Sequence, residues 1–154
     1  MAQKLRLAVL IDGENVSGHF ADALFVRIAE HGKARLRRVY GDFTNSSAVN
    51  TWMGPVAKHA IVPRQVFNVA KNAADITLTM DAAELLISNQ FDGFCIVSSD
   101  AHFVHLANRI REKGLAVFGF GHDNTADVFQ QSCTEFVPTS KLQRNRVATA
   151  PPRA

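Results

Sequence analysis

The sequence predicts an α/β fold, a three-layer sandwich built on a mostly parallel sheet. Short apolar runs such as 7–11 and 93–97 have no polar break, which is typical of strands buried on both faces of a parallel sheet. These runs alternate with longer segments in which apolar residues recur at helical spacing. Strands that alternate with helices along one chain predict right-handed crossovers, with helices covering both faces of the sheet.

Capping residues and helix breakers divide the first half of the chain. Ser17 is a candidate N-cap for a helix, and Gly32 stands where that helix should end. Ser46 or Ser47 can begin a second helix, which Gly54-Pro55 should break or kink. The expected elements are, in order, a strand at 7–11, a helix carrying the apolar residues of 20–28, a strand at 36–40, a helix around 49–53 and a strand at 64–69.

The second half of the chain continues the alternation. A helix that begins near Asp75 is expected to carry an apolar stripe made of Ile76, Met80, Ala83 and Ile87. Further along we expect a strand at 93–97, a helix around 103–110, a strand at 115–120, a helix capped by Asn124 or Thr125, and a short strand at 135–137. The sequence shows no internal repeat and no second domain.

Composition and charge suit one domain, expected at 1–137, followed by a basic and flexible tail at 138–154. The chain has 17 Lys and Arg and 14 Asp and Glu residues. Four of these basic residues lie in the tail, which has no acid, so the folded part is not globally basic. The tail can either attract polyanions or serve as a solubilising end.

Membrane association is not expected, because no apolar run is long enough to span a bilayer and the N-terminus lacks a signal-peptide pattern. Cys95 and Cys133 both lie in apolar segments, which is typical of buried thiols in a reducing compartment. A cytoplasmic location is therefore expected.

Two of the predicted strands end in carboxylates. Asp12 follows the run 7–11 directly, and Asp100 comes shortly after the run 93–97. Taken alone, an aspartate at such a place can simply start a turn. If the two strands are parallel neighbours, however, both carboxylates emerge at the edge of the sheet where ligands bind. Two neighbouring carboxylates do not both ionise cheaply, so either one keeps a proton or a cation lies between them.

Further candidate residues surround these two carboxylates. Asp75, at a helix start, is either an N-cap or a third member of the group. Asp81 lies about 120° around the same helix and is expected in a second shell or exposed. The remaining candidates are Lys71, Ser99, His102 and Thr125 as contacts to a substrate, and Ser98 in the second shell; Lys71 and Thr125 also have ordinary structural interpretations, as a loop lysine and a helix cap.

The donor set favours a hard cation. Asp12, Asp75 and Asp100 offer only oxygen ligands, which Mg²⁺ and Mn²⁺ prefer. A zinc site built from histidines is disfavoured, because His102 and His105 share a polar helix face and both cysteines lie in apolar runs. No phosphate-binding glycine loop or dinucleotide fingerprint is present, so no nucleotide cofactor is indicated.

These residues resemble the NYN domain, in the LabA-like branch of the PIN-like nucleases. The resemblance spans nearly all of 5–137 and is carried by Ile11-Asp12-Gly13-Glu14-Asn15, by Lys71 to Asp75 with Asp81, and by Ser98-Ser99-Asp100-Ala101-His102-Phe103. It implies a Rossmann-like sheet of order 3-2-1-4-5 and a metal-dependent endoribonuclease. In that family pattern Asp12, Asp75 and Asp100 would hold the metal, and Asn15 would orient the first carboxylate or the scissile phosphate.

The sequence departs from the family pattern at one position. The last motif often reads Ser-x-Asp-x-Asp-Phe, and here His102 replaces the second acid. The loss of that carboxylate removes a charge and can weaken binding of a second metal, although an imidazole can still position water or contact phosphate.

Three functions follow from these observations. The first is hydrolysis of RNA, expected to be single-stranded, by a Mg²⁺- or Mn²⁺-dependent ribonuclease; a homodimer is left open. The second is a non-catalytic RNA-binding or regulatory module, which the substitution at His102 and the basic tail favour. The third is a phosphatase of the haloacid dehalogenase type, which is disfavoured because that class needs a second Asp two positions after Asp12, where this chain has Glu14.

Overall fold

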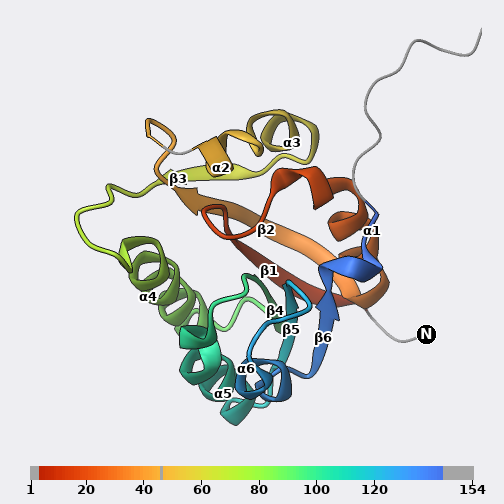
Figure 1. The fold of residues 1–154 in the computed structure, drawn as a ribbon. Helices are drawn as coiled ribbons and strands as arrows, with labels where there is room; N and C mark the ends of the chain where they lie inside the picture. Colours follow the sequence, from red (N-terminus) through yellow and green to blue (C-terminus); the bar gives the residue numbers. More distant parts are fainter. Residues whose placement is uncertain (1–3, 46, 144–154) are drawn as a thin grey trace, which may run out of the picture.

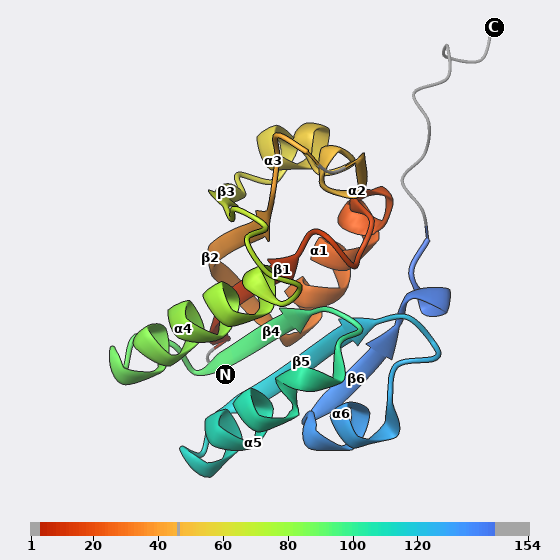
Figure 2. The same cartoon turned by 60° about the vertical axis from the view of Figure 1, so that its left-hand side comes forward.

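A six-stranded, wholly parallel sheet of order β3-β2-β1-β4-β5-β6 forms the middle layer of the protein (Figures 1 and 2). The structure is a computed structural model, and it describes residues 4–45 and 47–143. The strands are β1 (Leu5–Asp12), β2 (Gly32–Gly41), β3 (Val62–Gln65), β4 (Gly93–Val97), β5 (Ala116–Gly121) and β6 (Glu135–Pro138). The predicted α/β sandwich and the order 3-2-1-4-5 are confirmed, with β6 added beside β5.

Helices cover both faces of this sheet. The first face carries η1 (Gly18–Phe20), α1 (Ala21–His31), α2 (Ser47–Asn50) and α3 (Met53–Lys58), and the second carries α4 (Ala73–Ile87), α5 (Val104–Glu112) and α6 (Asp127–Ser132) (Figure 1). Two short 3₁₀ turns, η2 (Ala101–Phe103) and η3 (Thr139–Lys141), complete the described elements. Each face of the sheet has its own apolar cluster, so the molecule has two cores separated by the strands.

Strand β1 is the centre of the architecture. It pairs with β2 on one side and β4 on the other, and its last six residues are buried. Leu10 packs in the core under α4 and α5, whereas Val9 and Ile11 pack in the core under α1. Ile11 is in register with Val97, the last residue of β4. Asp12 and the residues after Val97 therefore leave the sheet at the same edge.

The buried face of α4 differs from the predicted stripe. Ile76, Met80 and Ile87 are exposed, and the stripe predicted from them is wrong. The buried residues lie on another side of the helix, at Ala74, Asp75, Leu78, Ala82 and Leu86. The helix is apolar on several sides, so spacing alone did not identify the face that meets the sheet; small residues such as Ala74 and Ala82 allow the close approach.

Smaller corrections concern the region between β2 and α4. The break expected at Gly54-Pro55 falls earlier, since α2 ends at Asn50 and Pro55 lies in the first turn of α3. Proline is tolerated there because the amides of a first helical turn have no partner within the helix. Strand β3 begins at Val62 rather than 64 and ends before 66–69, which belong to the loop that leads to α4.

The C-terminal part of the described chain packs onto the first face of the sheet. Leu142 is buried in the core under α1, so packed residues continue beyond 137. Residues 144–154, most of the predicted tail, lie outside the described residues. Within the described residues no helix has both the length and the apolar character that crossing a bilayer requires. Cys95 and Cys133 are buried free thiols, as expected.

Candidate functional site

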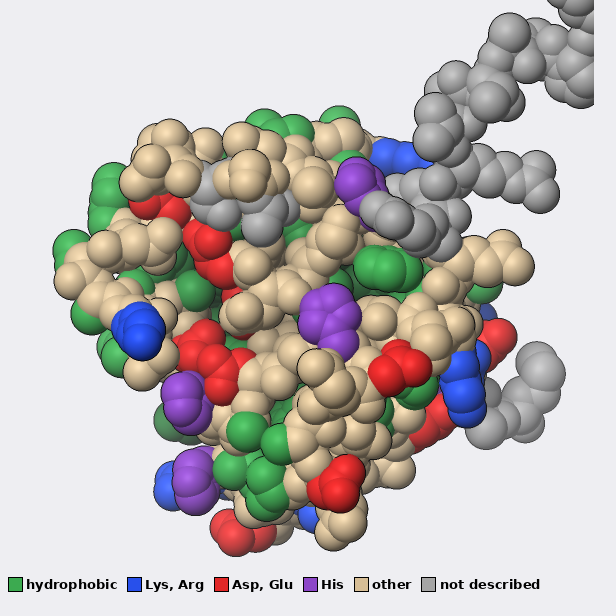
Figure 3. Space-filling view, in the orientation of Figure 1, with side chains coloured by type: hydrophobic (Ala, Val, Ile, Leu, Met, Phe, Trp, Pro, Cys, Tyr) green, Lys and Arg blue, Asp and Glu red, His purple; other side chains and the backbone are tan. Residues whose placement is uncertain are grey.

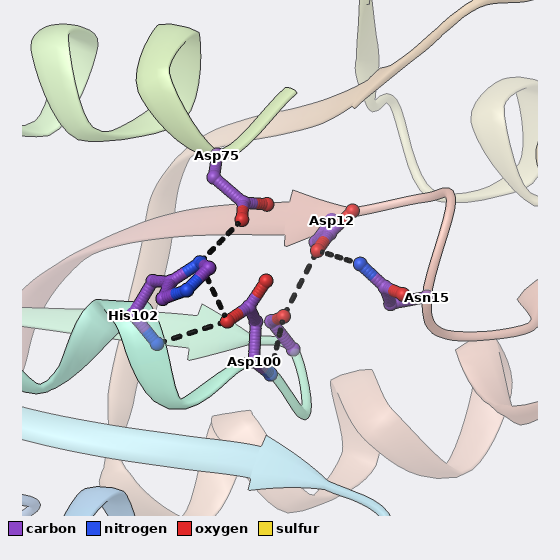
Figure 4. Close-up of polar contacts among 6 residues, drawn as sticks. Asp12, Asn15, Asp75, Asp100 and His102 are labelled. Carbon is purple, nitrogen blue, oxygen red and sulfur yellow. Dashed lines mark hydrogen bonds and ion pairs between the residues drawn. The ribbon is translucent and has the colours of Figure 1, made fainter. Parts of the chain in front are cut away.

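Side chains from three separate segments meet at the carboxyl edge of the sheet (Figure 4). Asp12 ends β1, Asp75 lies in the first turn of α4, and Asp100 and His102 belong to the turn after β4. The Nδ1 atom of His102 lies 3.3 Å from Asp75 Oδ2 and 3.0 Å from Asp100 Oδ1. One ligand atom from each of Asp75, Asp100 and His102 falls within 4.8 Å of the others.

A tight turn places Asp12 and Asn15 together. The amides of Asn15 and Val16 donate to the Asp12 carbonyl, at 3.2 and 3.1 Å, which folds the chain back at the end of β1. Gly13 is needed in this turn, because a Cβ atom there would lie 2.8 Å from a methyl group of Val39 on the neighbouring strand. The turn returns the Asn15 side chain to the Asp12 carboxylate.

The two oxygens of Asp12 have different surroundings. Oδ2 accepts hydrogen bonds from Asn15 Nδ2 at 2.5 Å and from Ser98 Oγ at 2.9 Å. Oδ1 is buried and accepts no hydrogen bond from any residue that the structure describes. Because a buried oxygen without a partner is costly, Oδ1 is an acceptor available to a ligand.

Asp100 and His102 are placed by the turn that follows β4. The amide of Asp100 donates to Ser98 Oγ at 3.1 Å, and the Asp100 carboxylate accepts the amide of His102 at 2.9 Å, which caps η2. Ser98 thus connects Asp12 to Asp100. Asp75 is the third residue of α4 and is not its N-cap, which is Asn72. An aspartate in the first turn is favoured by the helix dipole.

The pKa values of these three carboxyl groups depend on their burial and on their closeness to one another. Burial, the hydrogen bond with Asp100 and the nearby charges raise the pKa of Asp75 to about 7. Burial also raises the pKa of Asp12, against the hydrogen bonds from Asn15 and Ser98. For Asp100 burial acts in the same direction, but hydrogen bonds with Asp75 and His102 outweigh it and lower its pKa. In the absence of a cation, Asp75 and Asp12 therefore retain a proton to higher pH than an ordinary aspartate, and Asp100 loses its proton more readily.

Little positive charge balances the three carboxylates. His102 is the single cationic side chain that forms an ion pair with Asp75 or Asp100 among the described residues, and none pairs with Asp12. Hydrogen bonding to Asp75 and the charge of Asp100 raise the pKa of His102, but its side chain is 63% exposed. Asp75, Asp100 and His102 each place one ligand atom close enough to share a cation, whereas Asp12 lies beside this group and is not part of it (Figure 4). The carboxylate oxygens favour Mg²⁺ or Mn²⁺.

Other predicted residues support the site without joining the cluster. Ser99 Oγ accepts the amide of His122 at 2.7 Å, and the buried Thr125 donates to the carbonyl of His122 at 2.6 Å. Both side chains thus hold the loop between β5 and α6. Thr125 and Asn124 do not cap α6, whose N-cap is Ala126. His122 itself contacts the carbonyl of Asn15 through Nε2 at 3.0 Å.

Asp81 lies apart from the cluster. Its carboxylate accepts a 2.7 Å hydrogen bond from the hydroxyl of Tyr40 and forms ion pairs with Arg64 and Arg38, at 3.2 and 3.5 Å. The expectation of a second-shell contact is therefore not met by any contact in the structure. The alternative expectation of an exposed side chain is not met either, because only 13% of it is exposed.

An open cleft of about 430 Å³ adjoins the carboxylates, and we call it the base cleft. It is lined by Glu14 and Asn15 from the turn after β1, by Asn68 and Lys71 from the loop before α4, and by Asp75. Figure 3 looks onto this side of the molecule and shows acidic side chains in a hollow, with a histidine beside them. Lys71 is exposed on the wall of the base cleft, where a phosphate group can reach it.

His102 was predicted to contact the substrate and not the metal. Its contacts with Asp75 and Asp100 make it a candidate ligand instead. The signal was present in the sequence, because His102 stands two residues after Asp100 at the position where the family pattern has an acid. What the sequence did not show is that a 3₁₀ turn directs both side chains to the same place.

The comparisons with known proteins agree with this geometry. No curated protein matches the chain. A crystal structure of a protein of unknown function, VPA0982 from Vibrio parahaemolyticus RIMD 2210633, is similar, with a TM-score of 0.71 and 17% sequence identity over 90% of this chain and 94% of that one. At this identity the likeness shows the fold alone. The NYN domain model matches residues 6–141, a span that includes every side chain of the cluster, and the chain therefore belongs to the NYN domain family of PIN-like nucleases.

Proposed function

We propose that this protein is a divalent-metal-dependent ribonuclease, of the LabA-like branch, that hydrolyses phosphodiester bonds in single-stranded RNA. The observation that carries the proposal is the meeting of Asp12, Asp75 and Asp100 at one edge of the sheet, where His102 is the only cationic side chain among the described residues that forms an ion pair with any of them. Membership of a nuclease superfamily supports the reaction type. The buried free thiols of Cys95 and Cys133 favour a reducing, cytoplasmic location.

Each residue of the cluster has a distinct role in the proposed reaction. Asp12, Asp75 and Asp100 would hold Mg²⁺ or Mn²⁺, which supplies an activated water and stabilises charge on the phosphodiester. Asn15 and Ser98 both donate to Oδ2 of Asp12 and so fix the orientation of this carboxylate beside Asp100. Lys71, on the wall of the base cleft, would contact a phosphate of the bound strand.

Proton movement at Asp75 accompanies binding of the cation. In the metal-free protein Asp75 keeps a proton in a large fraction of the molecules near neutral pH, because its pKa is about 7. Asp75 would lose this proton when its oxygens hold a cation, since a ligating carboxylate must be ionised. His102 remains beside Asp75 and Asp100, where its imidazole can ligate the ion or orient water.

The experiment that tests the proposal measures cleavage of a labelled single-stranded RNA with Mg²⁺, with Mn²⁺ and with EDTA. We expect cleavage with either metal, none in EDTA, and none by Asp12→Asn. The matched control is Asp127→Asn, because Asp127 is an exposed aspartate on α6 that lies outside the cluster. Equal cleavage in EDTA, or an active Asp12→Asn variant that contains no wild-type contaminant, would contradict the proposal.

A non-catalytic RNA-binding module is the alternative that the same experiment separates. His102 at the place of the usual acid favours it. In that case RNA binding would persist in EDTA and fall steeply with salt, while no metal would give turnover.

A further inference from the structure

We propose that the base cleft binds the nucleobase next to the scissile phosphate and selects guanine, with Glu14 as the residue that determines specificity. This inference rests on the proposed ribonuclease function. The base cleft has a volume of about 430 Å³, within the range of about 300–1,000 Å³ that small-molecule sites occupy. Asp75 lines it, so a base bound there lies directly beside the carboxylate cluster.

Hydrogen bonds hold the walls of the base cleft in place. Glu14 Oε1 accepts the amide of Asp42 at 2.8 Å, which ties the turn after β1 to the end of β2. Asp42 Oδ1 in turn accepts Gln65 Nε2 at 2.9 Å, at the end of β3. The amide of Asn68 also bonds to Asp42, so the loop before α4 joins the same network. A ligand would therefore meet a preformed surface, which lowers the cost of binding.

Two acceptors on the lining have no partner among the residues that the structure describes. The Oε1 atom of Glu14 accepts a hydrogen bond from the amide of Asp42, and its Oε2 atom accepts none from the described residues. The side-chain nitrogen of Asn15 donates a hydrogen bond to Asp12, and its Oδ1 atom likewise accepts none within the described part of the chain. Two consecutive residues of the first motif thus each bring an acceptor oxygen without a partner among the described residues to the lining of the base cleft, and that of Glu14 is charged.

Guanine is the base that best matches these acceptors. Proteins that recognise unpaired RNA bind the Watson–Crick edges of its bases. On that edge guanine presents two neighbouring donors, N1–H and the N2 amino group. Adenine and cytosine each present an amino group beside an unprotonated ring nitrogen, which a carboxylate repels, and uracil presents one N–H between two carbonyl oxygens. A carboxylate therefore favours guanine over the other three bases.

Other residues of the same loop can hold the rest of the nucleotide. The side-chain amide of Asn68 can donate to the guanine O6 atom, and the ammonium group of Lys71 can contact the phosphate. Phe67 precedes Asn68 and is 69% exposed, which is unusual for an aromatic side chain. Exposed aromatic rings are the surfaces on which unpaired bases stack, so Phe67 would hold the neighbouring base.

The first experiment maps cleavage sites on an unstructured RNA that contains all four bases in equal number. We expect cuts next to guanine to be favoured about five-fold or more, the ratio that about 1 kcal/mol of base discrimination gives. Glu14→Gln keeps a carbonyl oxygen for the Asp42 amide but replaces Oε2 by a donor, so the preference for guanine should disappear. Glu112→Gln, at an exposed glutamate of α5, should leave the preference intact.

The ratio between bases is measured within each variant, so it is independent of any change in overall rate. Cleavage without a preference for guanine, or the same preference in Glu14→Gln, would overturn the inference and leave the ribonuclease function standing.

A second experiment tests the base cleft without hydrolysis. Guanosine, adenosine, cytidine and uridine are titrated into the protein in Mg²⁺, and the side-chain amide signals of Asn15 and Asn68 are followed by NMR. We expect guanosine alone to shift them, and the shift to be lost in Glu14→Gln. Guanosine binding in a protein that cleaves no RNA would refute the proposed function but not the guanine site, whereas equal shifts with all four nucleosides would refute the guanine site.

Discussion

Two aspartates of α4, Asp75 and Asp81, share one helix and one chemistry but have opposite surroundings. Asp75 lies among Asp12, Asp100 and a largely exposed histidine. Asp81 accepts a hydrogen bond from buried Tyr40 and forms ion pairs with Arg38 and Arg64. The helix separates them by about 9 Å along its axis, six residues at about 1.5 Å each. The carboxylate of Asp75 therefore lies among other negative charges, whereas that of Asp81 is neutralised by arginines.

This difference distinguishes a site for a ligand from a structural contact. A carboxylate that is paired with arginines has its charge satisfied within the protein, and its replacement affects stability. A carboxylate that is crowded by others retains an unsatisfied charge, and such groups are candidates for function. Replacing each aspartate in turn tests whether Asp75 has a functional role and Asp81 a structural one.

The largest expected effect is on catalysis. Asp75→Asn should lower kcat/KM for RNA cleavage by about 100-fold or more, because it removes a charge that acts on the developing transition state. Asp81→Asn should leave kcat/KM nearly unchanged. Steady-state rates measured at saturating Mg²⁺ check both. A comparable loss in the two variants would show that Asp81 belongs to the site after all.

The next effect is stabilisation by metal. At a free Mg²⁺ concentration about 100 times its Kd, binding adds about 2.7 kcal/mol to the free energy of unfolding. For a chain of this length each kcal/mol corresponds to about 2–4 °C in Tm. The wild type and Asp81→Asn should show this shift in thermal denaturation with and without EDTA, and Asp75→Asn should show little of it. An undiminished shift in Asp75→Asn would place the ion elsewhere.

A smaller effect concerns the stability that Asp81 provides. Asp81→Asn should lower the free energy of unfolding by about 1.5 kcal/mol, the usual contribution of a hydrogen bond to a charged group. The hydroxyl of Tyr40 supplies most of this contribution, because Arg64 is 47% exposed and exposed ion pairs contribute little. Chemical denaturation of Asp81→Asn, Tyr40→Phe and the double variant measures the coupling between the two residues. Additive effects would mean that the contact with Tyr40 is not stabilising.

The last expected effect is on the pH dependence of stability. Folding raises the pKa of Asp75 to about 7, so between the ordinary aspartate pKa and about 7 the folded state binds a proton that the unfolded state has lost. The free energy of unfolding of the metal-free protein should therefore fall as pH rises through this window. Asp75→Asn should flatten that slope and be the more stable protein above pH 7. Denaturation in EDTA at several pH values checks this, and an unchanged slope in Asp75→Asn would assign the proton to another group.

The fold was predictable to a large degree, and the errors have a common cause. The strands at 7–11 and 93–97 were predicted correctly, because a short apolar run that is bounded by polar residues is typical of a buried strand. The buried face of α4 was not found, because Ile76 and Met80 are as apolar as Leu78 and Leu86, which do contact the sheet. Periodicity cannot orient a helix that is apolar on more than one side.

The candidate site was predictable in part, for a similar reason. Asp12 and Asp100 were expected together, and Ser98 Oγ bonds to both of them in the structure. Asp81 was expected either in the second shell or exposed, and neither holds, because its position depends on the rotation of α4 about its axis, which packing decides. His102 was expected at the substrate, and its contact with two carboxylates depends on the geometry of a 3₁₀ turn.

By itself the sequence determined that carboxylates would gather at one edge of a parallel sheet, because parallel strands all end on the same side and Asp12 and Asp100 follow two of them. Only the tertiary structure decided which further side chains join them. Packing of Ala74, Leu78 and Ala82 against the sheet turns Asp75 toward Asp100 and Asp81 toward Tyr40, and it is this packing, set by contacts distant in sequence, that separates the functional aspartate from the structural one.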